Sequence, residues 1–212
     1  MLDVHARHDK MHGLKDFLLH LFTITVGLLI ALSLEGCVEW QHHRHLVQEA
    51  EEGLRGEIAQ NEKSISYLRQ QIEARQKELN GDLSALDKIR AHPTEKHEST
   101  SFTFSMRGFD DVAWRTVQTT GAFAYMPYNE ARIYSDIYAT QDEVYKAERQ
   151  TVDDVIRAAS FVSTRSDDWQ PTIPQIDEIE DRIGAVRMRL MLLSSLVDSL
   201  EKSYQKFQAE HH

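Results

Sequence analysis

The chain has 212 residues, 34 acidic and 24 basic, so its formal net charge is −10 at neutral pH. Such an acidic chain is a poor partner for nucleic acid, because binding there depends on neutralising phosphates with Lys and Arg. The single cysteine excludes an internal disulfide, and few prolines and glycines interrupt stretches of good helix formers, so the composition predicts an all-α protein.

A polar N-terminal tail, residues 1–16, precedes the most apolar stretch of the chain. From Phe17 to Leu34 the sequence FLLHLFTITVGLLIALSL carries no formally charged residue. As a helix this stretch would be about 27 Å long, close to the roughly 30 Å thickness of the hydrocarbon core of a bilayer. Trp40 is suited to the interface that follows. We predict a single transmembrane helix over 17–36.

Two other interpretations of the same stretch stay open. Ala31-Leu32-Ser33 resembles the small-x-small site at which a signal peptide is cleaved. Leu34-Glu35-Gly36-Cys37 resembles a bacterial lipobox, in which Cys37 would carry a lipid. Three Lys or Arg residues precede the span and two lie in the first twenty residues after it. This small bias favours a cytoplasmic N-terminus and an exported body.

Small residues recur every four positions within the predicted span, at Thr23, Gly27 and Ala31. Small side chains at this spacing allow two membrane helices to approach closely. The same residues also fit the ordinary composition of membrane helices, in which Gly is common. We therefore regard them as candidates for self-association of the span.

A long heptad-bearing helix is predicted over 37–92, since no proline interrupts that range. Five apolar residues recur every seven positions, and their companion row is half polar, with Asn61 and Arg75 in it. This pattern suits one face of a helical bundle better than an uninterrupted two-stranded coiled coil. The five apolar positions are Ile58, Ile65, Ile72, Leu79 and Leu86.

A connecting loop is predicted over 93–110, followed by a bundle segment over 111–212 with antiparallel packing of its helices. A short helix opens at an Asp suited to a cap and breaks near Gly121, and a long helix covers about 128–165. A heptad helix over about 174–208 has the clearest periodicity of the chain, but periodicity does not say whether its partner is in the same chain. Its apolar positions are Ile176, Ile179, Ile183, Val186, Leu190, Leu193, Val197, Leu200, Tyr204 and Phe207.

Parts of the sequence resemble an uncharacterised family of bacterial inner-membrane proteins. The matching positions are Val26 to Leu32 in the span, Glu39-Trp40, the basic run His42 to His45, and Ala113-Trp114 with Gly121. The resemblance covers residues 15 to about 145. It implies a single-pass envelope protein with a helical domain, and it implies no activity.

Candidate chemistry is sparse. His42, His43 and His45 invite a metal site, but one helix face offers two good ligands where a closed site needs three or four. Together with Trp40 and Arg44 they fit an interface with lipid headgroups. The histidines at 5, 8 and 12 have a similar spacing and the same interpretation, and His20 is suited to the near interface.

Aromatic residues could line a ligand pocket, although such residues more often form core: Trp114, Tyr125, Tyr128, Tyr134 and Tyr138.

We therefore expect a membrane-anchored, non-enzymatic scaffold or interaction protein of the bacterial cell envelope, with no cofactor and no metal. Its expected partners are the lipid bilayer, further copies of itself and an unidentified envelope protein. The expected location is the inner membrane, with the C-terminal domain in the periplasm. The alternative is a sensory, ligand-binding helical bundle that signals through a separate membrane partner.

Overall fold

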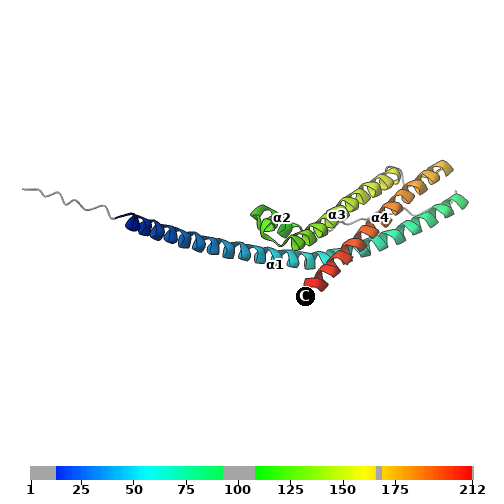
Figure 1. Cartoon of the computed structure of the whole chain (residues 1–212). Helices are drawn as coiled ribbons and strands as arrows, with labels where there is room; N and C mark the ends of the chain where they lie inside the picture. The colour runs from blue at the N-terminus through cyan, green and yellow to red at the C-terminus, as the bar shows by residue number, and fades with distance from the viewer. Residues whose placement is uncertain (1–12, 93–107, 166–168, 212) are drawn as a thin grey trace, which may run out of the picture. The chain divides into compact units, whose positions relative to one another are not determined.

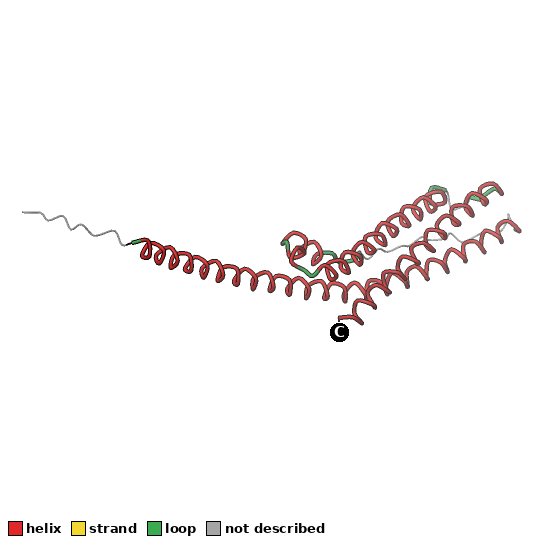
Figure 2. The backbone as a smooth tube through the Cα atoms, in the orientation of Figure 1, coloured by secondary structure: helices red, strands yellow, loops and turns green. Residues whose placement is uncertain are grey.

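The computed structural model describes residues 13–92, 108–165 and 169–211, and regular structure within them is entirely helical (Figures 1 and 2). The elements are α1 (Leu14–Ala91), α2 (Val112–Thr120), the short 3-10 helix η1 (Ala122–Tyr125), α3 (Tyr128–Ser163) and α4 (Ile173–His211). The predicted all-α fold is confirmed. Most of the predicted loop over 93–110 lies outside the described residues.

The chain divides into two compact units, one ending at Gln48 and the other comprising Glu49–His212. Helix α1 supplies residues to both units, as predicted from the lack of proline between the apolar stretch and the heptad stretch. Its first buried side chain is Leu54. The second unit therefore contains the described core of the protein.

The second unit is a bundle of α3, α4 and the C-terminal part of α1. Arg189 of α4 pairs with Asp154 of α3 at 3.1 Å, and Arg182 Nη1 donates to the carbonyl oxygen of Arg157 at 2.9 Å. Residue numbers on α4 thus fall as those on α3 rise, which confirms the predicted antiparallel packing (Figure 1).

Helix α1 is antiparallel to α4 as well. Arg69 pairs with Asp198 at 2.8 Å, whereas Arg90, further along α1, pairs with Asp177 at 2.9 Å near the start of α4. It follows that α1 and α3 are parallel. A parallel pair needs a connection that returns to the starting end of the bundle, and α2 and η1 belong to the described part of that connection.

The interior of the bundle contains the residues that periodicity predicts. The five heptad positions of α1 and nine of the ten predicted positions of α4 are buried, and Ile179 is half-buried. Burying one such side chain stabilises the fold by about 1.5–3 kcal/mol relative to leaving it exposed. The apolar face of α4 therefore packs within its own chain, against α1 and α3.

The predicted break at Gly121 is a left-handed turn. Gly121 has φ 78° and ψ 4°, a conformation that glycine adopts readily because it lacks a Cβ atom. It ends α2 and leads directly into η1. Pro127 then precedes α3, and the chain runs parallel to α1 from that point.

Candidate functional site

The apolar stretch of α1 contributes nothing to a core within the first unit. No residue of its most apolar 18-residue window is buried, and Phe17, Phe22 and Ile24 are among its exposed side chains. A core helix of a water-soluble protein with the same composition would be buried. Helix α1 is long and apolar enough to cross a membrane.

Polar side chains within this stretch bond to the helix itself. The hydroxyls of Thr23, Thr25 and Ser33 donate to the carbonyl oxygens four residues earlier, at 2.7–2.9 Å. His20 Nδ1 lies 2.9 Å from the carbonyl oxygen of Asp16. These bonds lower the cost of placing the polar groups in hydrocarbon.

Thr23, Gly27 and Ala31 are exposed, as a self-association surface requires. A Cβ atom added at Gly27 would meet nothing within 4 Å in this chain. The glycine is therefore not required for packing within the chain, and its small size is available for contact with another helix.

The predicted membrane-interface residues lie on the next turns of α1. Trp40 is exposed, and the guanidinium carbon of Arg44 lies 5.4 Å from the centre of its indole ring. His43 Nε2 lies 4.0 Å from Glu39 Oε1, and the His42 and His43 rings are 6.0 Å apart. His42 and His45 are exposed. An exposed Trp next to an Arg is typical of a helix at a membrane interface.

Within the described residues, no group of three or more His, Cys, Asp or Glu side chains is placed to hold a metal ion. Cys37 is exposed. The histidines at 5, 8 and 12 lie outside the described residues.

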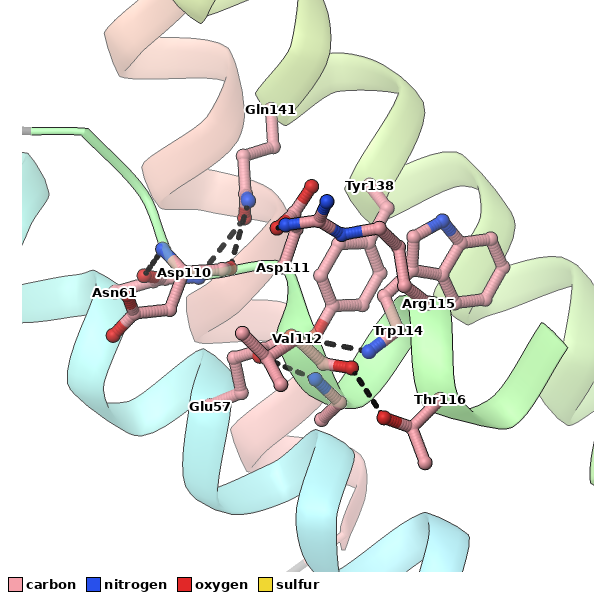
Figure 3. A network of polar contacts seen from close by, with 11 residues as sticks. Glu57, Asn61, Asp110, Asp111, Val112, Trp114, Arg115, Thr116, Tyr138 and Gln141 are labelled. Atoms are coloured by element: carbon pink, nitrogen blue, oxygen red, sulfur yellow. Dashed lines mark hydrogen bonds and ion pairs between the residues drawn. The ribbon is translucent and has the colours of Figure 1, made fainter. Parts of the chain in front are cut away.

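A polar cluster occupies the region where α2 meets the bundle, and Glu57 of α1 is at its centre (Figure 3). The backbone N–H of Ala113 donates to Glu57 Oε2 at 2.7 Å, and that of Trp114 donates to Oε1 at 3.3 Å. The hydroxyl of Tyr138 donates to Oε1 at 2.6 Å. Glu57 thus satisfies two amides at the start of α2 and binds α3 at the same time.

The side chain that caps the N-terminus of α2 is not the Asp that the sequence predicts. Asp111 occupies the N-cap position of α2, but its φ of −137° and ψ of 15° depart from cap geometry, and its carboxylate makes no capping hydrogen bond. It forms an ion pair with Arg115 instead. The prediction that an Asp at the start of this helix caps it is wrong, because a carboxylate from α1 takes its place.

Asn61, one turn further along α1, completes the cluster. Its Nδ2 donates to the carbonyl oxygen of Asp110 at 2.7 Å, and its Oδ1 accepts from the backbone N–H of Asp110 at 2.8 Å. It also donates to Gln141 Oε1 at 3.1 Å, which accepts from the Tyr204 hydroxyl at 2.6 Å. Segments from α1, α3, α4 and the entry to α2 therefore meet at one buried amide pair.

The aromatic residues proposed as a pocket lining do not all lie together. Trp114 stacks on Tyr138 with ring centres 4.8 Å apart and planes 5° apart, and Tyr134 is buried against Phe207. Tyr125 and Tyr128 are exposed instead. Tyr134 and Tyr138 belong to the core, and Trp114 is half-buried against Tyr138.

Burial changes the acidity of three tyrosines. Burial raises the pKa of Tyr134 to about 12. Burial also raises the pKa of Tyr138, and its hydrogen bond to the Glu57 carboxylate raises it further. Burial raises the pKa of Tyr204. The hydroxyls of Tyr138 and Tyr204 therefore stay protonated at neutral pH and donate to Glu57 and Gln141.

The chemistry of this cluster is structural. Asn61, Gln141 and Glu57 are held by several hydrogen bonds each, which fixes α2 on the bundle. Sequence reasoning singled out Asn61 only as a polar interruption of the heptad rows and did not identify Glu57 or Gln141. The one available signal in the sequence was that two positions of the heptad rows, Asn61 and Arg75, are polar. Both side chains are buried in the structure.

The fold and the exposed apolar segment define the class: an all-helical protein in which one helix among the described residues is long and apolar enough to span a membrane. No family model, curated protein or solved structure matches the chain.

Proposed function

We propose that the protein is a single-pass, membrane-anchored, non-enzymatic scaffold or interaction protein of the bacterial cell envelope. The observation that carries the proposal is that no residue in the apolar window of α1 is buried, so the window needs a cover that the first unit does not supply. A lipid bilayer covers it in the simplest way. The bacterial inner membrane is part of the proposal because of the resemblance at the span and at residues 39–45.

The second unit supports an interaction role. Its polar cluster joins four segments with satisfied hydrogen bonds, which suits a rigid body that presents surfaces to partners. Such a body needs no moving part to act as a scaffold. We place it in the periplasm, on the small excess of Lys and Arg before the span.

Retention of the apolar segment is the first test of the proposal. The intact mass of the purified protein should include residues 17–36, and the protein should leave membranes with detergent but not with alkaline carbonate. A C-terminal alkaline phosphatase fusion should be active if the body is periplasmic. A mature chain that begins near residue 34 or 37 would contradict retention of the transmembrane anchor.

The second test concerns self-association of the span. Gly27→Leu should weaken self-association in a membrane two-hybrid reporter about tenfold, because a large side chain keeps the helices apart. Leu28→Ile, beside it, is the matched control and should leave the signal unchanged. An unchanged signal for Gly27→Leu would remove Thr23, Gly27 and Ala31 as an interface.

A further inference from the structure

The outer face of α4, directed away from the core, carries three exposed apolar side chains. Met188, Met191 and Leu192 are 66%, 60% and 48% exposed, whereas Leu190 and Leu193 beside them are buried. A cluster of exposed apolar residues on one helix face marks an interaction surface more often than isolated ones do. Methionine is also common at binding surfaces, because its side chain adapts to different partners.

Small residues lie next to these apolar side chains on the same face. Gly184, Ser195 and Ser199 are all exposed, and a Cβ atom at Gly184 would meet nothing within 4 Å in this chain. Large and small residues thus follow one another at steps of three or four. A second helix with the same sequence could place its methionines over these small residues.

The two ends of the face have opposite charge. Asp181 and Lys202 lie at equal sequence distances from the midpoint of Met191 and Leu192, and both are exposed. In the described part of the chain, neither forms an ion pair. The outer α4 face consists of Asp181, Gly184, Met188, Met191, Leu192, Ser195, Ser199 and Lys202.

We propose that the outer α4 face binds a second copy of the same chain, with the two α4 helices antiparallel. In this orientation Asp181 of each chain lies opposite Lys202 of the other, so a two-fold contact contains two such pairs. A parallel pair would place Asp181 against Asp181 and Lys202 against Lys202, which is unfavourable. Charge complementarity therefore favours a second copy of the chain as the partner and the antiparallel direction of the two α4 helices.

This inference rests on the proposed scaffold function and adds a partner to it, a second copy of the same chain. Self-association of the span pairs two helices in parallel, whereas the outer α4 face pairs them in the opposite direction. The two contacts are therefore different.

The test uses the full chain in detergent, where no bilayer restricts how two chains meet, and in a Gly27→Leu background that weakens the proposed span contact. Sedimentation velocity should show a dimer. Met191→Glu and Lys202→Glu should each weaken it about tenfold, and the double charge exchange D181K/K202E should restore it to within about twofold. Ile156→Glu, on the exposed side of α3, is the matched control and should leave the dimer unchanged.

The direction of the pair is measured by crosslinking. Two differently tagged chains, one with Asp181→Cys and one with Lys202→Cys, are mixed in a Cys37→Ser background and treated with a short bis-maleimide. Crosslinks between the two chains should exceed those between like chains at least about fivefold. A monomer in the Gly27→Leu background, or crosslinks mainly between like chains, would overturn the proposal. Neither result affects retention of the transmembrane anchor, which the intact mass tests separately.

Discussion

Glu57→Ala should lower the free energy of unfolding of the second unit by about 3 kcal/mol. The carboxylate accepts from the amides of Ala113 and Trp114 and from the Tyr138 hydroxyl. Hydrogen bonds to a charged group contribute about 1.5–3 kcal/mol, and loss of a helix cap costs about 1 kcal/mol. Alanine also leaves the buried hydroxyl of Tyr138 without its acceptor.

Trp114 reports this change directly, because its ring stacks on Tyr138 beside Glu57. In a chain with Trp40→Phe and Trp169→Phe, its fluorescence should shift to longer wavelength at lower urea concentration in Glu57→Ala than in the parent. Glu52→Ala is the matched control, since Glu52 is an exposed acidic residue on the same helix. Equal urea midpoints for Glu57→Ala and Glu52→Ala would show that Glu57 does not hold α2.

The free energy of unfolding should fall steeply as the pH becomes alkaline, because three buried tyrosines have raised pKa values. Folding holds their protons more tightly than the unfolded chain does, for which a tyrosine pKa of about 10 is normal. The stabilisation is therefore fully present below pH about 10 and is lost as the pH rises through the pKa of the folded state, about 12 for Tyr134. Each tyrosine contributes a slope of up to about 1.4 kcal/mol per pH unit.

Urea unfolding between pH about 9 and about 11.5 measures this slope. Tyr204→Phe should lower the free energy of unfolding at pH about 8 by about 1 kcal/mol, because Gln141 loses a donor. It should also make the alkaline slope shallower by the contribution of one tyrosine. Tyr128→Phe is the control, since that ring is 79% exposed and lies outside the cluster. An alkaline slope that is the same in Tyr204→Phe and in the parent would contradict the role of burial.

Together these experiments separate the two units of the protein. Glu57 and the tyrosines affect the folded body, whereas Gly27 and the intact mass concern the span. The outer α4 face can be changed without touching either, because its residues are exposed and make no contribution to the core. A loss of self-association can therefore be assigned to one surface.

The sequence by itself determined the helical class, the apolar segment and the inward faces of the long helices. These properties are local, since helical periodicity and an uncharged run of 18 residues depend only on neighbouring positions. The heptad positions Ile58 to Leu86 are all buried, and α3 and α4 begin within a few residues of the predicted positions. The break at Gly121 was predictable because glycine readily adopts the left-handed conformation.

Only the tertiary structure decided what those faces contact. The amide of Ala113 is capped by a carboxylate 56 residues earlier, and Asn61 bonds to Gln141, 80 residues later. Local sequence favoured an Asp cap, but backbone angles at Asp111 moved its carboxylate away while the packing of α1 on α2 brought Glu57 into reach. The parallel direction of α1 and α3 is likewise seen only in long-range pairs, Glu57 with Tyr138 and Asn61 with Gln141. Pairings at such separations are set by the packing of the whole bundle, because many residues have the same local preference and only the packed helices bring these particular polar groups within hydrogen-bond distance.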